Sequence, residues 1–216
     1  MTEVVKELVF LHVPHTGGRV LISEFKKIKE EDPHLNVVWP HQPRDFHAVK
    51  RDCVGVQQYF ILRPTIDRLL GQFIHYTKRL QLVGIANHLR IGSLPKGFQL
   101  DNPRHFFMIE ENRNLYCKFL LNRKDFSKPV TFTDFKRVLA FFNSEQSPIW
   151  DVYTFPNKFT QLETFLERTV NCQKFNQSSG EKREGLKNNK DLIRLIELLN
   201  KHDIVLYEKL IKIKGL

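Results

Sequence analysis

The stretch that decides the fold covers residues 8–31 and reads LVFLHVPHTGGRVLISEFKKIKEE. Residues 8–14 are mostly apolar and rich in β-forming types, so they predict a short buried strand. The Gly17-Gly18 pair then interrupts the apolar run. Between residues 20 and 28 the apolar side chains recur at helical spacing, which predicts a helix over residues 19–31. The order is therefore strand, glycine turn, helix.

The same alternation continues along the first third of the chain. Residues 36–39 (NVVW) predict a second short strand, and residues 57–63 (QQYFILR) predict a third. Residues 65–79 follow with apolar positions at helical spacing. Strands that alternate with helices favour a parallel sheet covered on both faces. We therefore expect an α/β domain of three layers, with a short parallel sheet.

The remainder of the chain predicts mostly helices. Thr131 is followed three residues later by Asp134, a capping pattern that precedes an apolar helical stripe. Apolar spacing predicts three more helices further on. The four ranges are 131–143, 159–170, 191–200 and 203–213.

Two segments have the composition of loops. Residues 88–104 contain two glycines and two prolines, and a segment of this size in a compact domain is often a lid or a substrate loop. Residues 171–190 are polar, basic and glycine-containing, so we expect a mobile surface loop there.

Composition indicates a folded globular protein. The chain has 216 residues, of which 41% are hydrophobic and 18 are Phe, which suits a single domain over residues 1–216. Its three cysteines lie far apart with no CxxC pair, so neither a disulfide framework nor a zinc knuckle is indicated. Neither a membrane span nor a signal peptide is recognisable. We expect a cytoplasmic protein with no membrane anchor and no metal.

The charge balance predicts an anionic ligand. Lys and Arg number 34 against 24 Asp and Glu, a formal net charge of +10. A basic excess alone does not separate nucleic acid, nucleotides and sulfated or phosphorylated substrates. We see no aromatic residues interleaved with Lys and Arg on a predicted exposed sheet, so nucleic acid is not the expected partner. The oligomeric state is not predicted.

The glycine turn is the first candidate site. A strand that ends in a glycine turn and opens a helix directs several backbone N–H groups, and the positive end of the helix dipole, to one place, where phosphate or sulfate binds well. The turn has neither the GxxxxGK[ST] spacing nor the GxGxxG spacing of two other phosphate-binding loops. A purely structural turn is the alternative.

The turn also carries a family resemblance. HVPHTGG, residues 12–18, resembles the HxPKTGG(T/S) loop of the carbohydrate sulfotransferases, the group that contains the heparan sulfate 2-O- and 6-O-sulfotransferases. FILRPTIDRLLGQFIHY, residues 60–76, resembles their LRDPVERLLSxYxH segment, and residues 111–122 are similar to their central Asn-containing helix. The C-terminal NxxDxxLY signature is matched by Asn200, Asp203, Leu206 and Tyr207.

The resemblance implies a function and a set of site residues. It implies a sulfotransferase fold and transfer of a sulfuryl group from 3′-phosphoadenosine-5′-phosphosulfate to a saccharide hydroxyl. Arg63 lies where parallel sheets bind ligands, and its forked guanidinium suits the 3′-phosphate. The other nucleotide-binding positions that the resemblance implies are Pro14, His15, Thr16, Gly17, Gly18, Arg19, Val20 and Gly71.

Two histidines are the candidate catalytic residues. His15 stands where the family has a lysine, and as an imidazolium it would stabilise the leaving oxygen, with Arg19 able to share that task. His41, in WPHQP, follows the second predicted strand and is the candidate base for the acceptor hydroxyl. The alternatives without a catalytic role are a neutral loop residue for His15 and an exposed turn residue for His41. His12 is expected to be a core histidine and not to pair with His15 on a metal.

Several positions depart from the family pattern. Arg19 and Val20 stand where hydroxyl residues follow the two glycines, and Gly71 stands where the 3′-phosphate serine would be. A second hypothesis follows from these departures: a degenerate sulfotransferase-like protein that binds a nucleotide or another anionic partner without turnover.

Overall fold

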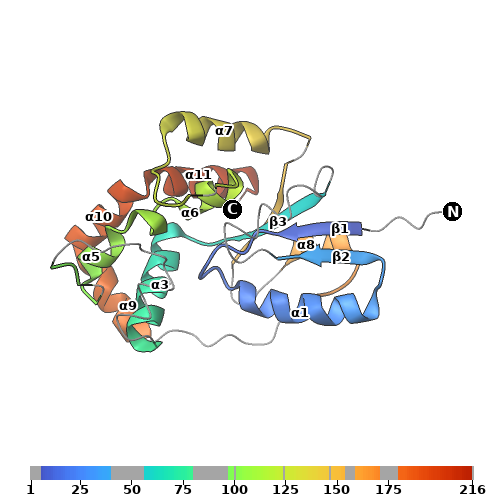
Figure 1. The fold of residues 1–216 in the computed structure, drawn as a ribbon, viewed down its shortest axis with the longest axis horizontal. Helices are drawn as coiled ribbons and strands as arrows, with labels where there is room; N and C mark the ends of the chain where they lie inside the picture. The colour runs from blue at the N-terminus through green and yellow to red at the C-terminus, as the bar shows by residue number, and fades with distance from the viewer. Residues whose placement is uncertain are drawn as a thin grey trace. The chain divides into compact units, whose positions relative to one another are not determined.

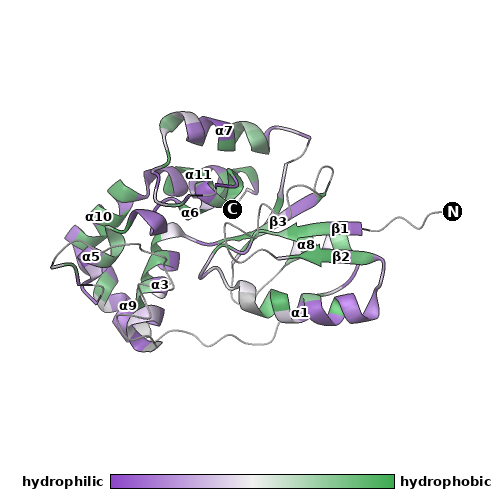
Figure 2. Cartoon of the chain, in the orientation of Figure 1, coloured by the Kyte–Doolittle hydropathy of each residue, from purple (hydrophilic) through white to green (hydrophobic). Residues whose placement is uncertain are grey.

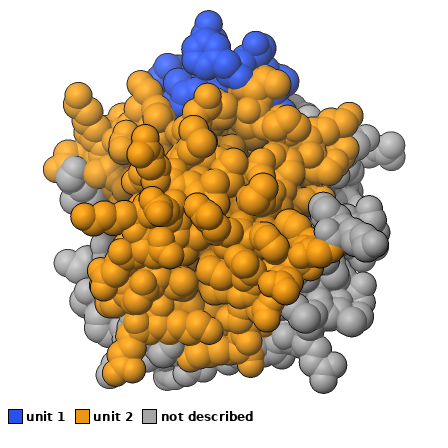
Figure 3. Space-filling model, turned by 90° about the vertical axis from the view of Figure 1, so that its left-hand side faces the viewer, with its two compact units in different colours: residues 1–63, 119–124, 132–175 blue, residues 64–118, 125–131, 176–216 orange. Residues whose placement is uncertain are grey.

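The computed structural model describes residues 6–39, 56–79, 97–99, 101–123, 125–145, 147–153, 159–170 and 180–215. The chain forms two compact units, which Figure 3 colours separately. Unit 1 comprises residues 1–63, 119–124 and 132–175, and unit 2 comprises residues 64–118, 125–131 and 176–216.

A parallel sheet of four strands forms the centre of unit 1 (Figure 1). The strands are β1 (Lys6–Phe10), β2 (Leu35–Val38), β3 (Gln57–Leu62) and β4 (Ile149–Val152), in the spatial order β2-β1-β3-β4. In register, Leu8 of β1 lies between Val37 of β2 and Gln57 of β3. The three predicted strands and the α/β fold are confirmed, although β1 ends at Phe10 and not at residue 14 as predicted. Strand β4 lies in the part of the chain expected to be helical.

Helices cover both faces of this sheet. Helices α1 (Gly18–Glu31) and α8 (Thr160–Leu166) share one hydrophobic core with β1, β2 and β3. Helix α7 (Phe132–Phe142) contributes Phe142, which packs on Phe60 and Trp150. Because side chains alternate along a strand, Phe60 faces away from the core that Tyr59 and Ile61 enter. Unit 1 therefore has the expected three layers.

The pattern of α1 explains how it packs. Leu21, Phe25 and Ile28 are buried, while Lys26 and Lys27 between them are exposed. This apolar stripe at helical spacing lies on one side of the helix and packs into the core. In Figure 2 the strands β1 and β2 are mostly hydrophobic, and α1 is hydrophilic toward its C-terminal end.

Strand β4 also supplies the cap of α8. The buried Asp151 carboxylate accepts hydrogen bonds from the backbone N–H groups of Gln161 (3.0 Å) and Leu162 (3.1 Å). Helix α8 begins without a side-chain cap of its own, so a strand residue satisfies the N–H groups at its start.

Unit 2 is helical in its described residues. It contains α3 (Thr65–Arg79), α5 (Pro103–Phe107), the 3₁₀ helix η1 (Glu110–Asn112), α6 (Leu115–Leu120) as far as Lys118, α9 (Gly180–Lys187), α10 (Lys190–Leu199) and α11 (Lys201–Ile213). Its core joins apolar residues of α3, α5 and α10, among them Phe73, Phe106 and Ile196. The helices predicted over residues 131–143, 159–170, 191–200 and 203–213 are confirmed within a few residues at their ends.

The prediction of a mobile loop over residues 171–190 is wrong from residue 180 onward, where α9 lies. Polar composition concealed this helix because its main apolar anchor is Leu186, which packs against the core of unit 2. Lys187 of α9 also forms an ion pair with Asp67 of α3 at 3.0 Å. Residues 171–179 lie outside the described part.

The predicted loop over residues 88–104 ends in a helix. Its last two residues begin α5, where the Asn102 side chain accepts from the N–H groups of Arg104 and His105. Residues 88–96 and 100 lie outside the described part of the chain. Within the described residues, no helix has the length and apolar character needed to cross a membrane.

Candidate functional site

The strand order defines where a ligand would bind in unit 1. From β1 the chain crosses to β2 on one side, and β3 pairs with β1 on the other side. In open parallel sheets ligands bind outside the carboxyl ends of the strands at such a switch in direction. The glycine turn follows β1 and Arg63 follows β3, so both lie at this edge.

Backbone hydrogen bonds hold the turn in a compact form. The Leu11 N–H donates to the Tyr59 carbonyl of β3 (2.7 Å), and the Val13 N–H donates to the Leu11 carbonyl (2.9 Å). The Thr16 side chain is fully buried, and its hydroxyl donates to the Val13 carbonyl (2.8 Å). The loop is thus folded onto itself before α1 begins.

Two residues of the turn have left-handed backbone conformations. His15 has φ 64° and Gly17 has φ 93°. This region disfavours side chains, so His15 holds a conformation that costs free energy and that the surrounding loop must stabilise. Gly17 is the N-cap of α1 and offers no side-chain cap, and the first turn of α1 has no acidic residue. An anion bound at the start of α1 would therefore not be repelled by an acidic side chain of the first turn.

Arg63 connects the turn to the end of β3. Its Nη1 donates to the His15 carbonyl oxygen at 3.0 Å, so the expected nucleotide-binding arginine and the expected loop residue are in direct contact. The Arg63 Cζ also lies 4.9 Å from the centre of the Tyr153 ring, a cation–π distance. The sequence placed these two residues at the same sheet edge, and the structure brings them together.

Tyr153 is the site residue that sequence reasoning missed. It follows β4, and its backbone N–H donates to the Leu62 carbonyl at 2.7 Å. A Cβ built on Gly17 would stand 2.8 Å from Cε2 of this ring, so Tyr153 fills the space that a side chain at position 17 would need. Only recognition of β4 as a strand would have placed Tyr153 beside Arg63.

His12 and Gly18 form a second close contact of the turn. The His12 ring stacks on Phe10 with 5.5 Å between ring centres, and a Cβ on Gly18 would lie 2.2 Å from His12 Cδ2. Strand β1 ends at Phe10, so His12 is in the loop and not on the strand as expected. The ring is half-buried and stacks on Phe10 at the margin of the core, whereas a core histidine was expected. Among the described residues, no group of three or more His, Cys, Asp and Glu side chains could hold a metal ion.

The remaining predicted site residues are placed as follows. Pro14 is a half-buried loop residue, and Val20 is half-buried in the first turn of α1. Arg19 belongs to α1, but its side chain lies outside the described part of the structure, as does all of His41. Gly71 is buried within α3 of unit 2.

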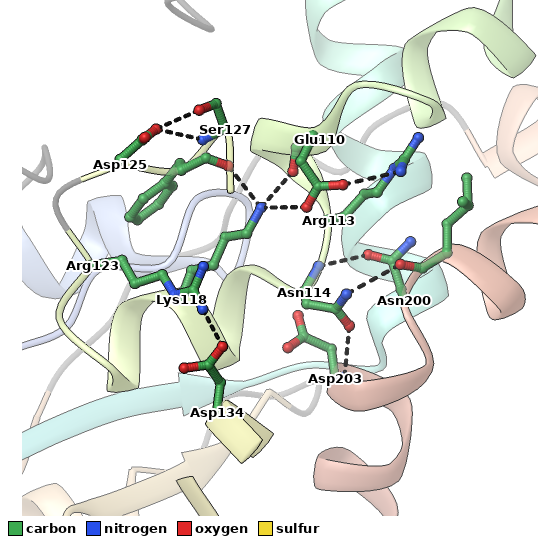
Figure 4. Close-up of polar contacts among 12 residues, drawn as sticks. Glu110, Arg113, Asn114, Lys118, Arg123, Asp125, Ser127, Asp134, Asn200 and Asp203 are labelled. Atoms are coloured by element: carbon green, nitrogen blue, oxygen red, sulfur yellow. Dashed lines mark hydrogen bonds and ion pairs between the residues drawn. The ribbon is translucent and has the colours of Figure 1, made fainter. Parts of the chain in front are cut away.

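A reciprocal capping cluster lies in unit 2 (Figure 4). The Asp203 carboxylate of α11 accepts from the N–H groups of Tyr116 (2.9 Å) and Cys117 (3.0 Å) at the start of α6. In return, the Asn114 side chain before α6 accepts from the Asp203 N–H (3.2 Å). The Asn200 side chain accepts from the Asn114 N–H (3.0 Å). Two residues of the C-terminal NxxDxxLY block therefore join two helix starts.

Arg68 is buried in the same unit and makes few hydrogen bonds. Its Nη1 donates to Gln72 (3.3 Å), and Gln72 donates to Asn112 (2.9 Å). Burial lowers the pKa of Arg68, while the nearby Asp203 charge raises it. Burial likewise raises the pKa of Asp203, against the opposing effect of Arg68. These two groups form a buried polar centre with no exposed surface, which suits a role in packing.

Lys118 is a further buried charge that the fold satisfies completely. Its Nζ donates to the Glu110 carbonyl (2.6 Å), the Glu110 carboxylate (2.9 Å) and the Phe126 carbonyl (2.8 Å), as Figure 4 shows. Three acceptors match the three N–H groups of an ammonium. Lys118 therefore holds η1 and the loop at residue 126 together and is not a candidate catalytic cation.

Comparison of the chain with protein-family models, with curated proteins and with solved structures found no match. The resemblance to carbohydrate sulfotransferases therefore stays a prediction from the quoted sequence blocks.

Proposed function

We propose that this protein is a sulfotransferase that moves a sulfuryl group from 3′-phosphoadenosine-5′-phosphosulfate to a hydroxyl of a saccharide or a related acceptor. The observation that carries the proposal is the hydrogen bond of 3.0 Å between Arg63 and the His15 carbonyl. It joins the glycine turn and a guanidinium at the switch point of a parallel sheet, where nucleotides bind in proteins of this architecture.

The turn and Arg63 fit the two anionic ends of such a nucleotide. The start of α1, with Gly17 as N-cap and no acidic residue in the first turn, would receive the 5′-phosphosulfate through backbone N–H groups. Because the Thr16 hydroxyl already donates within the loop, Thr16 would contribute its backbone and not its hydroxyl. Arg63 would bind the 3′-phosphate, since its planar, forked guanidinium matches the geometry of a phosphate group.

The proposed chemistry follows from these positions. The acceptor oxygen forms a bond to sulfur as the bond from sulfur to the bridging phosphate oxygen breaks, and the acceptor proton passes to a base. His15 stabilises the charge that develops on the leaving oxygen. His41 is the candidate base on sequence grounds. We propose that the reaction takes place in the cytoplasm and needs no metal.

Binding of the product nucleotide tests the proposal. The purified protein is titrated with 3′-phosphoadenosine-5′-phosphate while its melting temperature is followed. A ligand at about 100 times its Kd adds ~2.7 kcal/mol of stability, which for a chain of this size raises the melting temperature by about 5 to 10 °C. Adenosine is the control ligand, because it lacks both phosphates. No shift with the bisphosphate at millimolar concentration would refute the proposal.

A binding protein without turnover is the second candidate function. It is favoured by Gly71, which offers no hydroxyl where the family has serine, and by His15 in place of the lysine. Transfer of labelled sulfate to a panel of saccharides separates the two functions. If His15 acts as an imidazolium, turnover should fall at alkaline pH, and His15→Lys should move that decline upward. His15→Ala should lose ~10²-fold in turnover.

The outcomes for His15 are distinct. A wild-type protein that binds the nucleotide but transfers nothing, with transfer gained in His15→Lys, would establish the binding function. An active wild type that is indifferent to His15→Ala would remove His15 from the mechanism.

A further inference from the structure

Tyr153 contacts both parts of the candidate site. It stands at the carboxyl end of β4, and its backbone is fixed there by the hydrogen bond from its N–H to the Leu62 carbonyl at 2.7 Å. Its ring lies 4.9 Å from Arg63 Cζ and fills the space beside Gly17. One aromatic side chain therefore packs on the turn that opens α1 and on the guanidinium that follows β3.

These contacts restrict the position of Arg63. A free arginine side chain has many rotamers, and ordering it when a ligand binds costs conformational entropy. The bond to the His15 carbonyl holds one end of the guanidinium, and the Tyr153 ring lies 4.9 Å from its Cζ. Because the same ring rests against Gly17, the separation between the guanidinium and the start of α1 depends on Tyr153.

We infer that Tyr153 is a positioning residue of this site: by holding Arg63, it favours a nucleotide phosphorylated at both the 3′ and 5′ positions over a 5′-monophosphate. The inference rests on the proposed function, because it assigns the 5′ group to the turn and the 3′-phosphate to Arg63. A nucleoside bisphosphate presents two anions at a fixed separation, and a fixed guanidinium binds the second anion with less loss of entropy. A 5′-monophosphate uses only the turn and gains nothing from that arrangement.

Two variants of Tyr153 test the inference by isothermal titration calorimetry. Tyr153→Leu removes the ring and keeps an apolar side chain, whereas Tyr153→Phe keeps the ring and is the matched control. Each protein is titrated with 3′-phosphoadenosine-5′-phosphate and with adenosine-5′-phosphate. We expect Tyr153→Leu to weaken binding of the bisphosphate ~10-fold, the scale of a partly desolvated cation–π contact, with less than about a 3-fold change for the monophosphate. Tyr153→Phe should match the wild type with both ligands.

A double variant then tests the route through Arg63. In an Arg63→Ala background, Tyr153→Leu should weaken bisphosphate binding by no more than about 2-fold further, because the side chain that it orients is gone. Additive losses would overturn the inference, since Tyr153 would then act without Arg63.

Other outcomes separate failure of the inference from failure of the proposed function. Equal losses for the two nucleotides in Tyr153→Leu would show that the ring only supports the turn, and no loss for either would show that it has no role in binding. Both results overturn the inference while nucleotide binding stands. A wild type that binds neither nucleotide would overturn the proposed function, and the selectivity assigned to Tyr153 with it.

Discussion

The Arg63 guanidinium donates to the His15 carbonyl and lies over the Tyr153 ring at the carboxyl end of β3. These two contacts fix the position of the Arg63 charge at the candidate site. An arginine held in place loses less entropy when it binds a phosphate than one that is free in solvent.

Arg63→Ala should therefore affect one phosphate of the nucleotide and not the other. We expect binding of 3′-phosphoadenosine-5′-phosphate to weaken by ~1.5 to 3 kcal/mol, the range for a hydrogen bond to a charged group. Adenosine-5′-phosphosulfate, which lacks the 3′-phosphate, should bind with nearly unchanged affinity. Calorimetric titration of both ligands measures the difference, and equal losses would remove Arg63 from the 3′-phosphate site.

At the scale of elements, the entry to α1 depends on a close approach that only glycine allows. A Cβ at Gly18 would meet the His12 ring at 2.2 Å and Phe10 Cζ at 2.8 Å. Gly18→Ala should therefore lower the free energy of unfolding by about 1 to 3 kcal/mol in urea titrations, the cost of forcing a methyl group into a packed site. If His12 is the obstacle, the double variant Gly18→Ala/His12→Ala should lose less stability than the two single losses added together.

Gly185 provides the matched control for that experiment. It lies inside α9, and a Cβ there has no neighbouring atom within 4 Å. Gly185→Ala should raise the free energy of unfolding by about 0.5 to 1 kcal/mol because alanine restricts the unfolded chain and favours the helix. A Gly18→Ala variant as stable as the wild type would show that the His12 ring moves aside without cost.

The hydrogen bonds that join the starts of α6 and α11 allow a second test of stability. Each oxygen of the Asp203 carboxylate accepts one N–H of α6. In Asp203→Asn the side-chain oxygen still accepts from one N–H of α6, but the NH₂ group faces the other N–H and cannot accept from it. The substitution should therefore lower the free energy of unfolding by about 1 to 3 kcal/mol at pH 7. Asp191→Asn, at an exposed position in the first turn of α10, is the control and should cost less than about 1 kcal/mol.

The pH dependence of that loss has a definite sign. Burial raises the pKa of Asp203, so the folded protein takes up its proton at a higher pH than the unfolded chain does. The contribution of Asp203 to stability therefore falls as pH rises from the unfolded value of about 3.9 through the raised pKa. The stability difference between wild type and Asp203→Asn should accordingly grow as pH is lowered from 7 toward 4 in urea titrations. A difference that shrinks over this range would mean that the two N–H bonds outweigh burial in setting the pKa.

For the whole molecule, local patterns predicted most elements, and the misses have two causes. Helix α9 has a polar sequence whose main apolar anchor is Leu186, whereas β4 depends on long-range pairing. The turn at Gly17 and the placement of Arg63 followed from neighbouring residues, because a strand, a glycine pair and a helical stripe are all local signals. Strand β4 has only four residues, and its pairing with β3 joins positions about 90 residues apart, such as Tyr59 and Ile149. Tyr153 depends on that pairing, so the same omission hid both the strand and the aromatic residue beside Arg63.

The sequence predicts one domain, but the chain forms two compact units, each with its own hydrophobic core. The question is whether the two units unfold together or separately. The chain passes from one unit to the other after residues 63, 118, 124, 131 and 175, and one of these passages falls within α6. A helix that is folded at one end and unfolded at the other loses hydrogen bonds without regaining the full entropy of unfolding. We therefore expect the two units to unfold together, as a small cooperative protein does.

Two optical probes test this cooperativity. Both tryptophans of the chain, Trp39 and Trp150, belong to unit 1, so their fluorescence follows that unit. Circular dichroism at the helical wavelength also follows α3, α10 and α11 of unit 2. The two urea transitions should have the same midpoint, and Gly185→Ala in unit 2 should shift the tryptophan transition as far as the helical one. A fluorescence midpoint that stays in place while the helical midpoint moves would mean that the units are separate domains.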